Sequence, residues 1–231
     1  MKRNTLVKQG FATKAIHGGY SENTFGALTA PIYQTSTFIF DSAEQGGRRF
    51  ALEENGYIYS RLGNPTSATV EEKLALLEGA EDAVVTASGM GAISSALWTA
   101  LKCGDHVLAS DTLYGCTFAL LMHGLTKFGI EVTLVDMSNL DAVRKALRKN
   151  TRVVYLETPA NPTLKLIDIK AVSTLAHEAS NAMVMVDNTF CTPYIQQPLT
   201  LGADVVLHSA TKYLNGHGDV IAGAVCGTTD F

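Results

Sequence analysis

Met183-Val184-Met185-Val186-Asp187-Asn188 and Val205-Val206-Leu207-His208-Ser209-Ala210-Thr211-Lys212 are the stretches that decide the fold of this chain. Each begins with a continuous apolar run, which is typical of a strand covered on both faces of its sheet. Each then ends in polar residues, where ligands gather in open α/β sheets. The sequence therefore predicts two buried strands, one ending in a carboxyl group and the other leading to an amine.

Similar apolar runs recur from about residue 80 onward, with helix candidates between them. Further strands are expected at residues 83–85, 107–109, 132–135, 153–156 and 222–225. Helices are expected at residues 93–101, 140–147 and 169–179. This alternation predicts an α/β fold with a mostly parallel sheet of about seven strands, covered by helices on both faces.

The two ends of the chain differ from this pattern. Residues 31–38 are extended and aromatic, and residues 57–66 resemble a loop that leads into a helix near 70–77. We therefore expect residues 1–60 to form an arm and intersubunit segment, and residues 61–231 to form the large domain. No covering helix follows the last strand, so we expect the C-terminal part of the molecule to be absent from this chain.

The composition is that of an ordinary globular protein. The chain has 231 residues, of which 46% are hydrophobic and 17% charged, and its formal net charge is −4. Mild acidity gives no electrostatic surface for nucleic acid. No apolar run is long enough to suggest a secretory signal or a membrane span. The four cysteines have neither paired nor zinc-ligand spacing, so a reducing cytoplasm fits best.

The polar residues after the strands indicate a particular cofactor. A lysine amine such as that of Lys212, held in an apolar setting, can lose its proton and form a Schiff base with an aldehyde. A buried carboxylate such as that of Asp187 can keep the ring nitrogen of pyridoxal 5'-phosphate protonated. Residues 88–92, Ser-Gly-Met-Gly-Ala, could seat a phosphate at a helix N-terminus. Tyr114 could stack on a planar ring.

Two other kinds of site are less well supported. Residues 89–94 begin like a dinucleotide-binding glycine motif, and Asp111 follows at a suitable distance, but Ser94 occupies the third glycine position. His208 and residues 217–219 are close in sequence without the spacing of metal ligands. We predict no metal site, and we expect His208 to be a packed strand residue or a hydrogen-bonding partner behind the cofactor.

Four stretches together resemble the Cys/Met-metabolism pyridoxal-phosphate enzymes. They are residues 59–66, 157–162, 186–189 and 209–219, and the similarity runs from about Phe11 to the end of the chain. The combination is highly specific. It implies the large domain of fold type I, with pyridoxal 5'-phosphate as the cofactor.

The resemblance also implies a role for each matched residue. Lys212 would hold the cofactor and then shuttle protons, Asp187 would pair with the pyridine nitrogen, and Tyr114 would stack on the ring. Asn161 would lie near the cofactor's phenolic oxygen and the substrate carboxylate. The residues that would hold the phosphate are Gly89, Met90, Ser209 and Thr211, with Tyr59 and Arg61 of the adjacent subunit. This sharing implies a homotetramer built as a dimer of dimers.

Cys116 narrows the expected chemistry. In the methionine gamma-lyases of this family, which the chain resembles most, the residue two positions after the stacking tyrosine is cysteine, as it is here after Tyr114. A polarizable thiol there could position the substrate side chain or the tyrosine hydroxyl. The resemblance implies α,γ-elimination of L-methionine to methanethiol, 2-oxobutanoate and ammonia, with homocysteine and cysteine as further substrates. Tyr114 would protonate the departing thiolate.

Several alternatives remain open. The same scaffold supports γ-replacement, as in cystathionine gamma-synthase and O-acetylhomoserine sulfhydrylase, and the cystathionine gamma-lyase reaction. A third possibility is a truncated, inactive interaction module. The arginine that binds the substrate carboxylate in the family is expected to lie outside these 231 residues. We therefore expect this chain alone to bind the cofactor weakly and to turn over little substrate.

Overall fold

The computed structural model describes residues 3–19, 23 and 25–231. The chain forms two compact units, Met1–Lys73 and Leu74–Phe231. The second unit contains the whole of the sheet that the sequence predicts.

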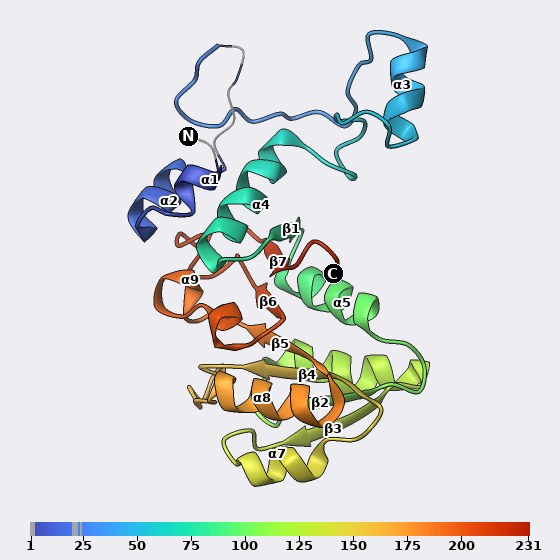
Figure 1. Cartoon of the computed structure of the whole chain (residues 1–231), viewed down its shortest axis with the longest axis vertical. Helices are drawn as coiled ribbons and strands as arrows, with labels where there is room; N and C mark the ends of the chain where they lie inside the picture. The colour runs from blue at the N-terminus through green and yellow to red at the C-terminus, as the bar shows by residue number, and fades with distance from the viewer. Residues whose placement is uncertain (1–2, 20–22, 24) are drawn as a thin grey trace. The chain divides into compact units, whose positions relative to one another are not determined.

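This sheet has seven strands in the order β1-β7-β6-β5-β4-β2-β3 (Figure 1). The strands are β1 (Asp82–Thr86), β2 (His106–Ser110), β3 (Glu131–Val135), β4 (Thr151–Glu157), β5 (Met183–Asp187), β6 (Val205–His208) and β7 (Gly223–Gly227). The pairs among β2 to β6 are parallel, whereas β7 is antiparallel to both β1 and β6. The predicted mostly parallel, seven-stranded sheet is confirmed.

Helices pack on both faces of the sheet, as predicted. On one face, α5 (Gly89–Ala100) and residues 120–128 contact Val107, Val153 and Met185. On the other face, α7 (Leu140–Ala146) and α8 (Ile169–Ser180) contact side chains such as Leu108 and Val154. Neighbouring residues of one strand thus point to opposite faces and are buried on both, which explains the continuous apolar runs. Each fully buried Leu or Val side chain contributes about 1.5–3 kcal/mol.

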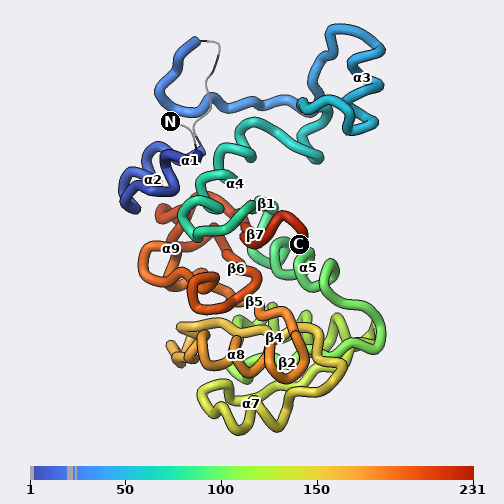
Figure 2. Tube along the Cα trace, viewed as in Figure 1, coloured from blue at the N-terminus to red at the C-terminus, as the bar shows by residue number. Residues whose placement is uncertain are grey.

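The remaining elements of the second unit connect strands. They are α6 (Gly115–Ala119), the π-helix η1 (Leu120–Gly124), the 3-10 helices η2 (Leu125–Phe128) and η3 (Pro198–Leu201), and α9 (Thr192–Ile195). The tube in Figure 2 follows the chain from β4 through α8 to β5, which connects two parallel, neighbouring strands through a helix. These connections bring residues that are distant in sequence to the carboxyl ends of the parallel strands.

The first unit contains more helix than the sequence suggested. Three short helices, α1 (Arg3–Leu6), α2 (Phe11–His17) and α3 (Ala43–Phe50), interrupt the arm. Residues 31–36 are without helix or strand, as expected for an extended segment. The helix predicted near residues 70–77 is longer: α4 spans Pro65–Glu78 and ends in the second unit. Among the described residues, no helix has the length and apolar character needed to cross a membrane.

Candidate active site

A cavity of about 210 Å³ lies where β4, β5 and β6 end. Its lining includes eight of the residues singled out in the sequence, namely Gly89, Met90, Tyr114, Asn161, Asp187, Ser209, Thr211 and Lys212. It also includes Ser88, Ile93, Glu157, Thr189, Phe190 and Ile221. The fold thus brings together polar groups contributed by five separate connections of the second unit.

Asp187 is the last residue of β5, and only 6% of it is exposed. Its Oδ1 accepts hydrogen bonds from the backbone N–H of Thr189 at 3.1 Å and from the Thr189 hydroxyl at 2.6 Å. Burial raises the pKa of Asp187, while these hydrogen bonds and the His208 charge oppose that rise. A cationic ring nitrogen beside this carboxyl group would favour its charged form, so the site suits a protonated pyridine.

The N-terminus of α5 approaches the turn after β6 very closely. A Cβ atom on Gly89 would lie 2.6 Å from the Cβ of Ser209, so only glycine fits there. Ser88 caps the helix by accepting a hydrogen bond from the backbone N–H of Gly91 at 3.0 Å. Gly89 and Met90, the first residues of α5, line the cavity together with Ser209, which is a suitable arrangement for a phosphate.

The hydroxyl group of Thr211 already forms hydrogen bonds within the chain. Its hydroxyl donates to the carbonyl of Ala222 at 3.1 Å and accepts from the Ala222 backbone N–H at 3.0 Å. A phosphate would have to share this hydroxyl with the segment that leads into β7. Thr211 therefore both joins two segments of the sheet edge and lines the cavity.

Lys212 lines the cavity but is exposed rather than enclosed in an apolar setting. The reason is local: β6 ends at His208, and the turn that follows carries Lys212 beyond the edge of the sheet. The turn is held by the Lys212 N–H, which donates to the carbonyl of Ser209 at 3.1 Å. The expected apolar surroundings of the amine are therefore not present within the second unit.

Tyr114 and Cys116 lie together at the start of α6. The Cys116 sulfur lies 3.4 Å from the Tyr114 hydroxyl oxygen, a hydrogen-bonding distance, and Tyr114 is 41% exposed. This hydrogen bond, followed by the Coulombic effect of Cys116, raises the pKa of the Tyr114 phenol. A phenol with a raised pKa keeps its proton at neutral pH, as a general acid must.

Glu157 is a site residue that the sequence analysis did not single out. It is the last residue of β4, pairs in register with Asp187 and is 4% exposed. Its carboxylate accepts the backbone N–H of Tyr114 at 2.7 Å and that of Asn161 at 2.8 Å. Its position in the sequence could have identified it, because Glu157 ends an apolar strand as Asp187 does.

A buried polar network joins the ends of β5 and β6 to α4. The Nε2 atom of His208 is 2.6 Å from Oε1 of Glu78, and both side chains are fully buried. The same carboxylate oxygen accepts a hydrogen bond from the Asn188 side chain at 2.9 Å. His208 is thus a packed strand residue with a hydrogen-bonding partner, and that partner, Glu78, is the last residue of α4.

Tyr59 and Arg61 belong to the first unit and lie together there. The guanidinium carbon of Arg61 is 5.4 Å from the centre of the Tyr59 ring. Tyr59 also forms an isolated antiparallel bridge with Thr37. Their implied contact with the phosphate of an adjacent subunit stays a prediction.

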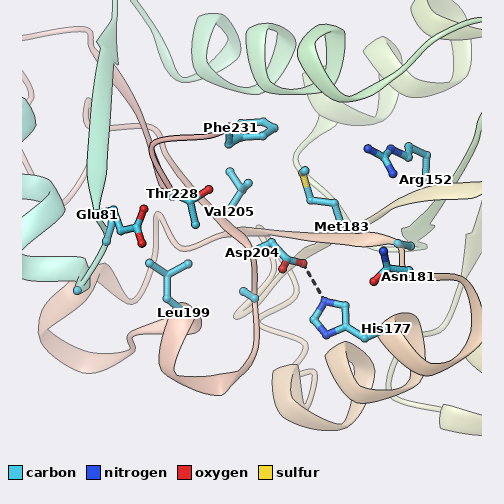
Figure 3. A pocket seen from close by; sticks show the side chains of 15 residues that line it. Glu81, Arg152, His177, Asn181, Met183, Leu199, Asp204, Val205, Thr228 and Phe231 are labelled. Carbon is cyan, nitrogen blue, oxygen red and sulfur yellow. Dashed lines mark hydrogen bonds and ion pairs between the residues drawn. The ribbon is translucent and has the colours of Figure 1, made fainter.

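A larger cavity, of about 730 Å³, lies at the opposite ends of β5 and β6 (Figure 3). Its most prominent pair is His177 and Asp204, joined at 2.9 Å. The Asp204 carboxylate also accepts the backbone N–H of Val184 at 2.7 Å, so it ties α8 and two strands together. These groups have a structural task, and we place the chemistry in the smaller cavity.

Comparisons with known proteins show which family the chain resembles. The model of the Cys/Met metabolism PLP-dependent enzyme family matches residues 12–231. The L-methionine gamma-lyase of Fusobacterium nucleatum subsp. polymorphum is 70% identical over 218 residues, which are 94% of this chain and 55% of that protein. The L-methionine gamma-lyase of Porphyromonas gingivalis is 65% identical over 231 residues, which are 100% of this chain and 58% of that protein.

A solved structure has a closely similar fold. It is that of a putative O-acetylhomoserine (thiol)-lyase from Campylobacter jejuni, described with N'-pyridoxyl-lysine-5'-monophosphate. It superimposes with a TM-score of 0.91 at 37% identity, over 96% of this chain and 55% of that one. The chain thus spans a little over half the length of the relatives it matches.

Proposed function

Because the chain belongs to the Cys/Met metabolism PLP-dependent enzyme family, we propose that the protein binds pyridoxal 5'-phosphate and degrades L-methionine. The products are methanethiol, 2-oxobutanoate and ammonia, and one water molecule is consumed. Homocysteine and cysteine are further proposed substrates. The observation that carries the proposal is the single cavity that unites Asp187, Lys212 and the N-terminus of α5.

The residues present fit the cofactor. The glycine-dependent approach of α5 to Ser209 brings a helix N-terminus and a serine hydroxyl together, which suits a phosphate. In the same cavity, the buried carboxyl group of Asp187 suits a protonated ring nitrogen. When bound, pyridoxal phosphate supplies an electron sink that stabilises negative charge on the substrate α carbon.

The chain's own groups would move the protons. Lys212 would hold the cofactor through its Nζ and, once displaced by the substrate amine, would remove the proton from the α carbon. Asp187 would accept a hydrogen bond from the ring nitrogen and keep it protonated. Tyr114, whose pKa is raised by its hydrogen bond with Cys116, would donate a proton to the departing thiolate sulfur. Asn161 would bind the substrate carboxylate and the phenolic oxygen of the cofactor.

We also propose that active sites are shared between subunits of a homotetramer, with residues 1–60 as the arm and intersubunit segment. Support comes from the large apolar side chains that the first unit exposes, including Phe25, Leu28, Ile32 and Ile39. Tyr59 and Arg61 would reach the phosphate held by the adjacent subunit. The proposed compartment is the cytoplasm, which is consistent with four free cysteines.

The test uses the full-length protein incubated with pyridoxal phosphate. Borohydride reduction followed by peptide mapping is expected to label the peptide that contains Lys212. Methionine supplied alone is expected to release thiol and ammonia. A strict need for a second substrate would instead indicate γ-replacement, and an unlabelled, colourless protein would indicate an inactive module.

A further inference from the structure

Glu157 holds two segments of the candidate site at once. One carboxylate oxygen, Oε2, accepts the backbone N–H of Tyr114, and the other, Oε1, accepts that of Asn161. The two distances, 2.7 and 2.8 Å, are those of strong, charge-assisted hydrogen bonds. The two donor residues, Tyr114 and Asn161, lie 43 and 4 positions away from Glu157, so the carboxylate joins a distant loop to its own.

The surroundings make this contact important for Tyr114. Tyr114 is the N-cap residue of α6, and its side chain makes no capping hydrogen bond. Its ring is partly exposed, so packing alone does not fix it. The bond to Glu157 therefore anchors the backbone from which the ring projects.

We propose that Glu157 is a positioning residue, which sets the Tyr114 ring and the Asn161 amide against the cofactor by accepting the backbone N–H of both. This inference rests on the proposed function, because it concerns the placement of a bound ring and substrate. Glu157 itself takes no part in the chemical steps.

The electrostatic setting makes this positioning sensitive to pH. Burial, and then the charge of Asp187, raise the pKa of Glu157 to about 7, although the two N–H bonds oppose the rise. The other titratable groups around it are Tyr155 on the same strand and, lining the same cavity, Tyr114 and Lys212. Below its pKa, Glu157 carries a proton that turns one acceptor oxygen into a donor. One of the two N–H groups then loses its partner.

The deciding variant is Glu157→Gln in the full-length protein reconstituted with pyridoxal phosphate. Glutamine keeps the shape and one acceptor oxygen, but its NH₂ group must face one of the two N–H donors. We expect the apparent Kd for pyridoxal phosphate to rise about tenfold, which corresponds to the loss of one hydrogen bond to a charged group. We also expect a changed circular dichroism band of the bound cofactor, and the loss of an activity transition near pH 7.

Glu131→Gln is the matched control, because Glu131 is an exposed residue of β3 whose carboxylate pairs with the surface residue Arg148. It is expected to leave both readouts unchanged. If wild-type protein binds the cofactor and Glu157→Gln has the same Kd, dichroism and pH profile, the positioning role is wrong while the proposed function stands. A wild-type protein that binds no cofactor would overturn the proposed function first, and this inference with it.

A second measurement uses the wild-type protein and therefore tests the role even if the Glu157→Gln variant does not fold. Hydrogen exchange at the backbone N–H groups of Tyr114 and Asn161 can be followed in the wild-type holoprotein across pH 6 to 8, around the pKa of about 7. After correction for intrinsic exchange, protection is expected to increase as Glu157 ionises. Constant protection over this range would refute the role.

Discussion

At the scale of single residues, Cys116 and Tyr114 form the pair on which the proposed choice of substrate rests. The thiol lies 3.4 Å from the phenol oxygen and raises the pKa of Tyr114. The phenol thus stays protonated to higher pH than an isolated tyrosine would. A departing thiolate needs such a donor, so in the proposed elimination the cysteine would act through its neighbour.

Replacing Cys116 tests this relation. In Cys116→Gly, the pKa of Tyr114 is expected to fall toward its ordinary value, because the hydrogen bond that raises it is gone. The basic limb of the pH profile of kcat should move to lower pH, and kcat/KM for methionine should fall about tenfold. Steady-state assays of the full-length protein across pH give both values. Cys103→Ser, at an exposed and remote thiol, is the control, and an unmoved basic limb would contradict the expectation.

At the scale of helices and strands, the site depends on how closely α5 approaches the turn after β6. The glycine at position 89 removes the side chain that would otherwise separate them. The consequence is that a phosphate can contact both segments at once. The identity of one residue, Gly89, therefore affects how the cavity is formed.

Gly89→Ala is expected to weaken cofactor binding by at least tenfold, because its Cβ would lie 2.6 Å from Cβ and 2.9 Å from Cα of Ser209. Titration of the apoprotein with pyridoxal phosphate measures this loss. Gly91→Ala is the comparison on the same helical turn, where the nearest atom is Ser88 Oγ at 3.3 Å, and its effect should be smaller. Equal binding by the two variants would show that the close approach is unimportant.

The buried network at the end of α4 leads to a prediction about stability. Glu78→Ala removes the acceptor of both His208 and Asn188, so we expect a loss of about 3–5 kcal/mol in the free energy of unfolding. Arg144→Ala breaks an ion pair whose side chains are 63% and 80% exposed, and should cost less than about 1 kcal/mol. Urea unfolding of both variants gives the comparison. Similar losses in the free energy of unfolding would mean that the buried pair stabilises the protein no more than the exposed ion pair does.

Much of this architecture could be predicted from the sequence, for identifiable reasons. The continuous apolar runs specify strands buried on both faces, and the polar residues that follow them place Asp187 and Lys212 at one edge. The direction of β7 could not be predicted, because a run such as Ala222-Gly223-Ala224-Val225 is the same for either orientation. Glu78 was missed because its partner His208 lies 130 positions away, and a glutamate at a helix end ordinarily faces solvent.

At the scale of the whole molecule, the first unit exposes several large apolar side chains. Ile39 is 94% exposed and Phe25 is 95% exposed. Large exposed apolar patches mark interaction surfaces. We expect these side chains to be covered in an assembly of identical chains.

Ile39→Asp is expected to weaken that assembly, since it would place a charge in the covered surface. Sedimentation equilibrium of the full-length variant should give a lower average mass than the wild type at the same concentration. Gln9→Asp adds the same charge at an exposed polar position of the same unit and should leave the mass unchanged. An unchanged mass for Ile39→Asp would place the interface elsewhere.

The pairing of β1 with β7 has a consequence for synthesis on the ribosome. β1 hydrogen-bonds to no other strand of the sheet, and β7 begins about 140 residues later. At translation rates of roughly 5–20 residues per second, the nascent β1 waits on the order of ten seconds for its partner. During that interval Val84 and its neighbours are open to wrong pairing. The cofactor pocket, which needs β6 and its following turn, likewise cannot form before Lys212 has been synthesised.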